Sequence, residues 1–245
     1  MAMLFRSKVK PKVVWTKTRD GWQLPLYHYR TDRQTSPWGP VILMHGLCAN
    51  RFDLDAPDPK ISLARFLHEH GHDVWVGELR GAGRARPPGW PLRGRKTFDF
   101  DDYVHRDVPA IVRKVLDASG SSSLHWVGHS MGGMLAYAAL EHYDQKLFRS
   151  LVTIASPAFT AVKHPLVDQL YKMRFMLNVL PWLPSRRLAQ LGSIAPGLIR
   201  SSLGQIVANP DNMDPKHIRQ LLRRALTDLP APLLKPVRAP IRALK

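Results

Sequence analysis

The sequence predicts an α/β protein with a mostly parallel sheet covered by helices. Two observations carry this prediction. The chain has short apolar runs typical of buried strands, and along residues 12–157 these runs alternate with helical segments. Such an alternation is typical of parallel sheets. The 245-residue chain is long enough for one such domain with a substantial core. Its 44% hydrophobic and 22% charged residues are those of a globular protein.

A β-hairpin is expected near the start of the chain, over residues 13–30. Two strand-like runs there flank Asp20 and Gly21, and an Asp-Gly pair is a strong signal for a two-residue turn. Further along, four short apolar runs have the length and composition of buried strands. The sequence predicts these strands at residues 41–46, 73–79, 123–130 and 150–156.

The first helix is expected before the strand at residues 73–79. Ser62 can cap this helix, the apolar residues Leu63, Phe66 and Leu67 recur at helical spacing, and a glycine closes it. The pattern therefore predicts an apolar face that packs on the sheet.

Two longer helices follow. Residues 100–120 form an amphipathic segment in which Pro109 is expected to kink the helix, because proline lacks the amide that a helix interior needs. The next helix is expected over residues 131–143, directly after a strand.

The alternation of strands and helices ends near residue 158. The remaining segments read as helices broken by prolines, without a strand between them. Residues 171–184, followed by Arg186 and Arg187, are either a lid that opens on lipid or an ordinary cap over a pocket for a soluble ester. The predicted parts are a core at 12–157, a helical cap or lid at 158–234 and a truncated or altered tail at 235–245.

The segment VGHSMGGMLAY holds the pattern G-x-S-x-G between an expected strand and an expected helix. Gly128 and Gly132 leave room for a tight turn that holds Ser130 in a strained conformation with its hydroxyl exposed. A serine in this setting is typically a nucleophile. The alternative is that Ser130 only caps the helix, and a lone G-x-S-x-G also arises by chance.

A second motif, HGLCAN, follows the strand at residues 41–46. His45 and Gly46 can turn the backbone so that the amide of Leu47 faces the same point as the amide of Met131, which begins a helix. Two such donors form an oxyanion hole, so Leu47 and Met131 are predicted to hold an oxyanion. His45 is predicted to be structural, and the alternative for Gly46 is an ordinary loop glycine.

Four segments, in this order and spacing, resemble the α/β-hydrolase superfamily: HGLCANRFDLD, DVWVGELRGAGRARPPG, FDDYVHRDVPAIV and VGHSMGGMLAY. The resemblance is greatest to its acid/gastric-lipase-like and bacterial lysophospholipase-like branches. It implies an α/β-hydrolase fold and a serine esterase or lipase, in which Ser130 attacks an ester carbonyl and water later releases the acyl group. It implies no metal and no organic cofactor.

The resemblance also implies a triad acid and a triad histidine after the serine, and neither is found in the expected place. In the family these residues follow the next two strands, so the sheet is expected to lack its last two strands and to expose an apolar edge. Residues 235–245 are either the start of a truncated acid-bearing strand or a frameshifted tail. The sequence leaves both explanations open.

Other histidines are poor substitutes for the missing base. His142 lies twelve residues past the serine, about 18 Å along a helix at 1.5 Å per residue. His164, with Asp168 four residues on, reads as a solvated cap residue, and His217 belongs to a basic helix. His129 adjoins the serine, but neighbouring side chains at a sharp turn point in different directions.

Three further features have plain structural interpretations. The alternating His68, His70 and His72 lack the surrounding carboxylates of a metal site, so no metal is predicted. Cys48 is expected to be a small buried residue. The basic segment at residues 80–96 is expected to be a solvated loop near the mouth of the site.

The charge balance favours anionic partners. The chain has 36 Lys and Arg against 19 Asp and Glu, a net charge of +17, which by itself does not choose among lipid headgroups, nucleic acid and acidic substrates. No nucleic-acid-binding signature accompanies it, so nucleic acid is not expected and contact with a membrane surface stays open. A single cysteine and a start without a signal-peptide core predict a cytoplasmic protein, peripheral to a membrane at most.

Three functions fit these observations. The first is a serine hydrolase for lipid or other apolar carboxylic esters. The second is a catalytically impaired, truncated family member that lacks the triad Asp and His. The third is a basic surface-binding protein that uses the same core as a scaffold.

Overall fold

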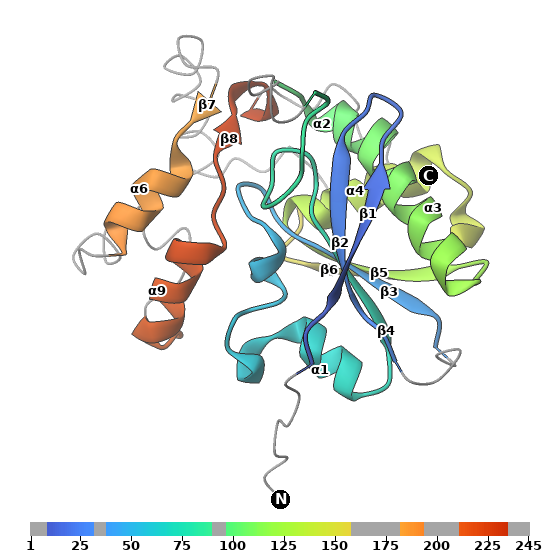
Figure 1. Ribbon diagram of the computed structural model, residues 1–245, viewed down its shortest axis with the longest axis horizontal. Helices are drawn as coiled ribbons and strands as arrows, with labels where there is room; N and C mark the ends of the chain where they lie inside the picture. Colours follow the sequence, from blue (N-terminus) through green and yellow to red (C-terminus); the bar gives the residue numbers. More distant parts are fainter. Residues whose placement is uncertain (1–8, 32–37, 90–96, 158–181, 194–210, 235–245) are drawn as a thin grey trace, which may run out of the picture.

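A twisted six-stranded sheet forms the framework of the molecule (Figure 1). The structure is a computed structural model that describes residues 9–31, 38–89, 97–157, 182–193 and 211–234. The strand order is β1-β2-β4-β3-β5-β6, in which β4, β3, β5 and β6 are parallel and the β1–β2 and β2–β4 pairs are antiparallel. The strands are β1 (Lys12–Lys17), β2 (Gln23–Tyr29), β3 (Pro40–Met44), β4 (Asp73–Gly77), β5 (Leu124–His129) and β6 (Phe148–Ile154).

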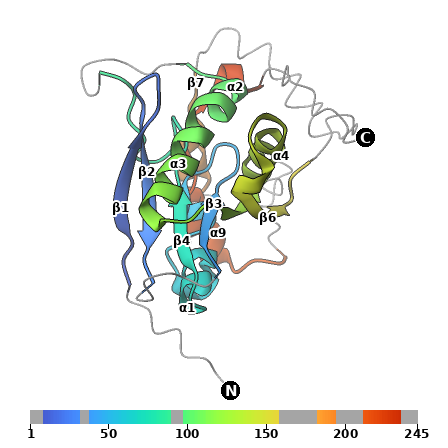
Figure 2. The same cartoon turned by 90° about the vertical axis from the view of Figure 1, so that its right-hand side faces the viewer.

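Helices cover both faces of this sheet. The α-helices are α1 (Leu63–Glu69), α2 (Phe100–Asp102), α3 (Val108–Ser119), α4 (Met131–His142), α6 (Ser185–Gly192) and α9 (Pro215–Arg224). The shorter helical turns are η1 (Arg51–Asp53), η2 (Pro59–Ile61), η3 (Tyr103–Asp107), η4 (Gln145–Leu147) and η5 (Ala231–Leu234). α3 and α4 lie on one face (Figure 2), and α1 packs on the other.

Side chains along β3 alternate between the two faces. Val41 and Leu43 pack in the cluster that contains Ala64 of α1, whereas Ile42 and Met44 pack in the cluster formed with α3 and α4. A strand buried on both sides in this way is typical of parallel sheets, and the predicted α/β fold is confirmed.

The predicted hairpin is present, but the prediction of a two-residue turn was wrong. Residues 18–22 connect β1 to β2. The Thr18 amide donates to the Trp22 carbonyl at 2.9 Å, and the Trp22 amide donates to Thr18 Oγ1 at 2.9 Å. Asp20 in this loop also accepts a hydrogen bond from Arg80 Nη1 at 2.9 Å, a contact with a distant segment that the local pattern does not reveal.

Helix α1 begins where the sequence predicts. Ser62 Oγ accepts a hydrogen bond from the amide three residues on, at 3.2 Å. Its buried face differs from the prediction, because Ala64 is fully buried and Phe66 is 45% exposed. Leu63 and Leu67 are partly buried and pack against the same cluster as Ala64.

The long helix predicted over residues 100–120 changes register before Pro109. It consists of α2, the π-helical turn η3 and then α3, in which Pro109 is the second residue. The missing proline amide explains the disruption, since π-turns arise where the regular helical ladder is interrupted. At its start, Asp99 and Asp102 each accept a hydrogen bond from the other's amide, which forms a capping box.

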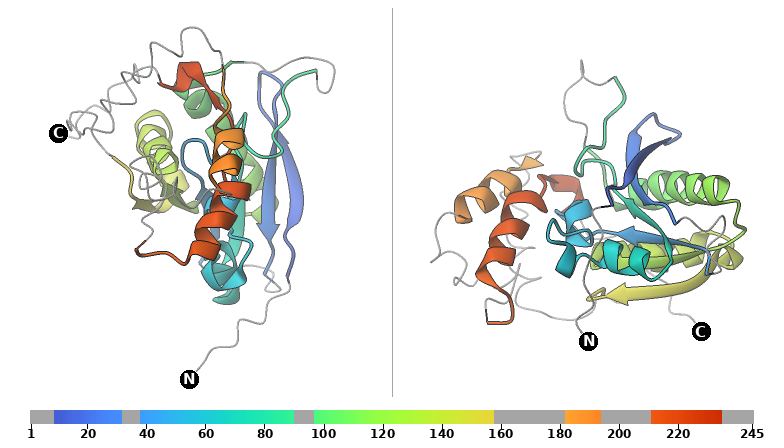
Figure 3. Two further views of the ribbon diagram at one scale, coloured as in Figure 1. Left: turned by 90° about the vertical axis from the view of Figure 1, so that its left-hand side faces the viewer. Right: turned by 60° about the horizontal axis from the view of Figure 1, so that its bottom comes forward.

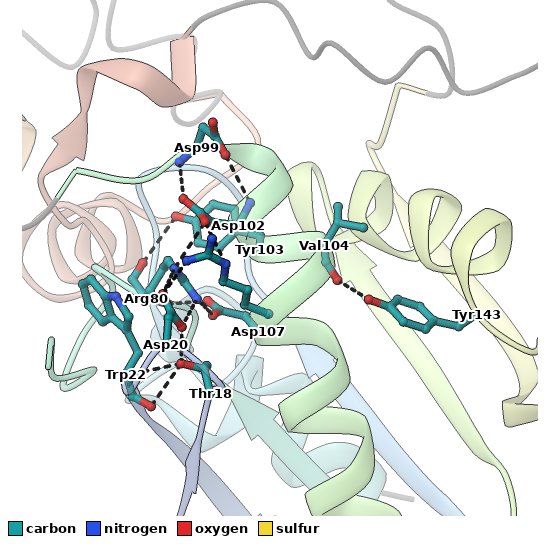
Figure 4. Close-up of polar contacts among 11 residues, drawn as sticks. Thr18, Asp20, Trp22, Arg80, Asp99, Asp102, Tyr103, Val104, Asp107 and Tyr143 are labelled. Atoms are coloured by element: carbon teal, nitrogen blue, oxygen red, sulfur yellow. Dashed lines mark hydrogen bonds and ion pairs between the residues drawn. The ribbon is translucent and has the colours of Figure 1, made fainter.

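Arg80 contradicts the prediction that residues 80–96 form a solvated loop. Its side chain is only 1% exposed (residues 90–96 of that loop lie outside the described residues). Figure 4 shows it among three carboxylates: Nε donates to Asp107 at 2.8 Å, Nη1 donates to Asp20 at 2.9 Å, and Asp102 lies 3.7 Å away. Burial of the guanidinium is possible because these acids, distant in sequence, neutralise it.

The segments after residue 158 contribute α6, α9 and a second, two-stranded sheet. The expectation of no strand in this part was wrong, since β7 (Trp182–Leu183) pairs antiparallel with β8 (Leu229–Pro230). α6 packs against α9, which lies beside η1 (Figure 3). Most of the segment 171–184 and all of the tail 235–245 lie outside the described residues.

Within the described residues, β6 is the last strand on its side of the sheet. Val152 and Ile154 are 50% and 40% exposed, so this edge is apolar. No helix in the described ranges is both long enough and apolar enough to cross a bilayer.

Candidate active site

Ser130 lies at the bend between β5 and α4. Its backbone has φ 50° and ψ −115°, a combination that is strained for any residue except glycine. The Ser130 amide donates to the Ile154 carbonyl at 2.8 Å, and the Ser130 carbonyl accepts from the Gly133 amide at 3.0 Å. The side chain makes no capping hydrogen bond, so the alternative that this serine only caps the helix does not describe the structure.

Two glycines let β5, α4 and the end of β3 meet at this bend. A Cβ on Gly128 would lie 2.3 Å from the carbonyl carbon of Gly132. A Cβ on Gly132 would lie 2.3 Å from the Met44 carbonyl oxygen. Both contacts are with backbone atoms, so neither position has room for a side chain.

The turn after β3 contacts the turn that carries Ser130. A Cβ on Gly46 would lie 3.2 Å from Ser130 Cβ and 3.1 Å from His129 Nδ1. Leu47 follows Gly46, and Met131 follows Ser130. In the described part of the chain, neither the Leu47 amide nor the Met131 amide makes a hydrogen bond. Two unpaired amides therefore belong to the two turns that meet at the serine.

His45 is buried and its ring is bonded at both nitrogens. Nδ1 lies 2.8 Å from the Gly46 carbonyl oxygen, and Nε2 accepts from the Leu79 amide at 3.2 Å. This network assigns the proton to Nδ1. Burial lowers the pKa of His45, which keeps the ring neutral and holds the turn that leads to Leu47.

An ion pair beside the serine was missed in the sequence. His129 Nδ1 lies 2.7 Å from Asp53 Oδ2, and the same carboxylate oxygen accepts from the Gly46 amide at 2.9 Å. The hydrogen bond that His129 donates to the Asp53 carboxylate raises the pKa of His129. Burial acts to raise the pKa of Asp53, but the hydrogen bonds from His129 and Gly46 outweigh it and leave that pKa below its ordinary value.

Nothing local in the sequence marks this pair. Asp53 follows β3 and His129 ends β5, and these strands are neighbours only in the folded sheet. Because β3 and β5 are parallel neighbours, their carboxyl ends lie at the same edge of the sheet. This shared edge is the one signal that could have linked Asp53 to His129.

The later histidines lie away from Ser130 or outside the described residues. His142 is exposed at the end of α4, with its ring 4.9 Å from the ring of His105. His217 Nε2 lies 3.2 Å from Asp58. His164 and Asp168 lie outside the described residues.

The sequence analysis also singled out Cys48 and three alternating histidines, His68, His70 and His72. Cys48 is partly buried, and desolvation raises the pKa of its thiol to about 12, so the sulfur stays protonated. Within the described ranges, no group of three His, Cys, Asp or Glu side chains is arranged to hold a metal ion.

Comparisons with known proteins point to one family. A family model described as the alpha/beta hydrolase fold matches residues 39–216. Lipase member K of Mus musculus is 32% identical over 161 residues, which cover 58% of this chain and 39% of the relative. Gastric triacylglycerol lipase of Rattus norvegicus is 30% identical over 155 residues, with the same coverage of 58% and 39%. The chain thus spans about two fifths of the length of these relatives.

Among solved structures, a carboxylesterase of the thaumarchaeon Nitrososphaera gargenis has a TM-score of 0.59 and 15% sequence identity. The match covers 90% of this chain and 69% of that one. At this identity the likeness concerns the fold alone.

Proposed function

Because the chain belongs to the α/β-hydrolase family, we propose that it hydrolyses carboxylic esters of lipids or other apolar compounds, with Ser130 as the nucleophile. The observation that carries the proposal is the backbone of Ser130. Its φ of 50° is a conformation that costs about 1–3 kcal/mol. Its hydroxyl makes no capping hydrogen bond to the amides at the start of α4. Strain of this kind at a serine with an unused hydroxyl supports a chemical role.

The two unpaired amides support the next step. When the serine oxygen attacks an ester carbonyl, the carbonyl oxygen becomes negative and needs donors. The Leu47 and Met131 amides belong to the turns that meet at Ser130 and make no hydrogen bond within the described residues. Loss of one such donor typically slows the reaction by about 10²–10³.

A second candidate function is a family member whose serine is present without a complete triad. His142 and His217 contact other residues, so they support no role as the base for Ser130. A serine hydrolase without its base is slower by about 10⁶ in turnover.

The names of the relatives, a triacylglycerol lipase among them, favour lipid esters as the substrates of the first candidate.

Labelling with a fluorophosphonate probe tests the nucleophile. The full chain is expected to react, and Ser130→Ala to abolish the reaction. Ser156→Ala is the matched control, because Ser156 lies beside the same helix but its hydroxyl bonds to the Ile154 carbonyl at 3.2 Å. Labelling that survives Ser130→Ala would refute the role of Ser130, whereas a folded protein that is never labelled supports the incomplete triad or a scaffold without catalysis.

Turnover separates the two candidates. Hydrolysis of p-nitrophenyl butyrate and of an emulsified triacylglycerol that is lost in Ser130→Ala supports the ester hydrolase. A folded chain that shows neither labelling nor turnover supports the incomplete triad, because the missing base also leaves the serine without activation. A preference for the emulsion over the soluble ester distinguishes lipid substrates from other apolar esters.

A further inference from the structure

A pocket of about 530 Å³ lies between α9 and the loop that precedes η2. Four basic side chains of α9 line it, and the loop contributes one carboxylate, Asp58. The four recur along one side of the helix at intervals of three, four and one residues: Lys216, Arg219, Arg223 and Arg224.

The protein itself neutralises little of this charge. Asp58 lies 3.3 Å from Lys216 Nζ and 3.2 Å from His217 Nε2, so its single negative charge is already shared. The hydrogen bond from the Lys60 amide, followed by those from His217 and Lys216, lowers the pKa of Asp58 to about 2. That carboxylate is therefore ionised at neutral pH.

Among the residues that the structure describes, the arginines of the pocket have no acidic partner. Arg223 Nε donates to Ser193 Oγ at 3.2 Å, a neutral group. Within the described ranges, Arg219 and Arg224 make no ion pair with any acid. Like charges three and four residues apart on a helix repel one another, and an anion bound between them would relieve this repulsion.

A polar atom in the same pocket is also unsatisfied. Gln220 lines the pocket between the basic residues, and its Oε1 is buried without a hydrogen-bond partner in the described part of the chain. Buried acceptors of this kind are rare in proteins, which indicates a missing donor. Because this oxygen is closed off from solvent, it does not define the ligand, and the four basic side chains alone indicate an anion.

We propose that this pocket binds a phosphate-bearing anion. Guanidinium groups bind phosphate oxygens in pairs of parallel hydrogen bonds, and several arginines together suit a group with more than one negative charge. The volume lies within the range of small-ligand pockets, about 300–1,000 Å³. The phosphate is carried either by a soluble compound or by a phospholipid headgroup.

The position of α9 connects this pocket to the loop after Leu47. Asn50 Nδ2 donates to the Arg224 carbonyl at 2.7 Å, the Asn50 amide donates to the Ala225 carbonyl at 2.9 Å, and the Thr227 amide donates to the Cys48 carbonyl at 2.7 Å. The pocket is separate from the Ser130 site, and the binding proposal does not depend on ester hydrolysis.

A binding measurement with the full chain tests the pocket. Inorganic phosphate is titrated at constant ionic strength against chloride, and binding is followed by calorimetry. The double variant Arg219→Gln with Arg223→Gln is expected to weaken phosphate binding by about tenfold or more, because charge-assisted hydrogen bonds are lost. Arg113→Gln with Lys114→Gln, which removes the same charge from α3, is expected to change it by less than about twofold.

The single variant Arg219→Gln guards against a folding defect, since this side chain makes no hydrogen bond or ion pair with the residues that the structure describes. It is expected to weaken binding while the unfolding temperature stays unchanged. Equal weakening in the α9 and α3 double variants, or no preference of the unmodified chain for phosphate over chloride, would overturn the proposal.

Vesicles identify the source of the phosphate. α6 packs against α9 and exposes Leu188 and Leu191, so a headgroup in the pocket would bring apolar side chains to the lipid. Cosedimentation with phosphatidylcholine vesicles that contain phosphatidic acid, lost in the α9 double variant but not in the α3 variant, supports a headgroup. Phosphate binding without cosedimentation supports a soluble phosphate compound. Cosedimentation that both double variants reduce equally would contradict a headgroup in this pocket.

Discussion

At the scale of single residues, Gly132 lies where the first turn of α4 touches the last residues of β3. A Cβ there would lie 2.3 Å from the Met44 carbonyl oxygen and 2.9 Å from the His45 carbonyl oxygen. Neither atom belongs to a side chain that could rotate away. The helix that follows Ser130 can approach the sheet this closely only because position 132 has no side chain.

Replacement of Gly132 by alanine is therefore expected to lower the free energy of unfolding by about 3 kcal/mol, the upper end of overpacking effects. Urea unfolding measures this loss. Gly120→Asn is the control, because Gly120 has φ 67° with nothing within 4 Å of a Cβ, and asparagine tolerates that conformation. A similar loss in both variants would mean that the close contact at Gly132 is unimportant.

The Asp53–His129 pair gives the stability a pH dependence. The pKa of His129 is raised above its ordinary value of 6.5, so its contribution is complete below that pH and is lost as the pH rises through the raised pKa. The pKa of Asp53 is lowered from its ordinary value of 3.8, so its contribution is present above that pH and is lost as the pH falls through the lowered pKa. Both contributions are present together between these ordinary values.

We expect Asp53→Asn to lower the unfolding temperature most between about pH 4 and 6.5, with a smaller difference at pH 9. Thermal unfolding of both proteins across this range measures the difference. Asp101→Asn serves as the comparison and is expected to show no such profile. A difference that does not vary with pH would show that the pair adds no charge-dependent stability.

At the scale of elements, the segment from α2 to α3 depends on how its first turn is capped. Asp99→Ala removes the hydrogen bond that the Asp102 amide donates to the Asp99 carboxylate, and is expected to lower the free energy of unfolding by about 1 kcal/mol. Asp101→Ala, two residues on in the same turn, is expected to change it by less than about 0.5 kcal/mol. Chemical denaturation compares the two, and an equal effect would indicate that charge near the helix start matters more than the cap.

Elements that bury a regular face were predictable. β3, β4, β5 and β6 lie within three residues of their predicted bounds, and α1 and α4 follow the expected caps and turns. Their patterns are local, since side chains two apart in a strand or three to four apart in a helix share a face. The position of Ser130 between a strand and a helix was predictable for the same reason.

The features that were wrong or missed depend on contacts between distant residues. The burial of Arg80 requires Asp20 and Asp107, and the pairing of His129 requires Asp53 from a different strand end. The short strands β7 and β8 are separated by more than 40 residues and have two residues each, too few for a periodic signal. No local pattern carries this information.

At the scale of the whole molecule, the charge of +17 opposes compaction. Raising the ionic strength from about 0.01 M to about 0.15 M shortens the Debye length from about 30 Å to about 8 Å. We expect the unfolding temperature to rise over this interval, because repulsion among the excess cations is screened more than the short buried pairs are. Differential scanning calorimetry measures the shift, and a fall would mean that attractive ion pairs outweigh the repulsion.

The buried guanidinium at position 80 has a consequence for how the chain assembles. Its acidic neighbours Asp20 and Asp107 come from the first hairpin and from the end of η3, directly before α3, 60 residues before it and 27 after it. Any partly assembled form that sealed this interior without either acid would enclose an unbalanced cation, which is costly by several kcal/mol. During synthesis the interior can therefore close only once the chain has emerged past residue 107, and the hairpin and α3 should exchange their amide hydrogens through one shared opening.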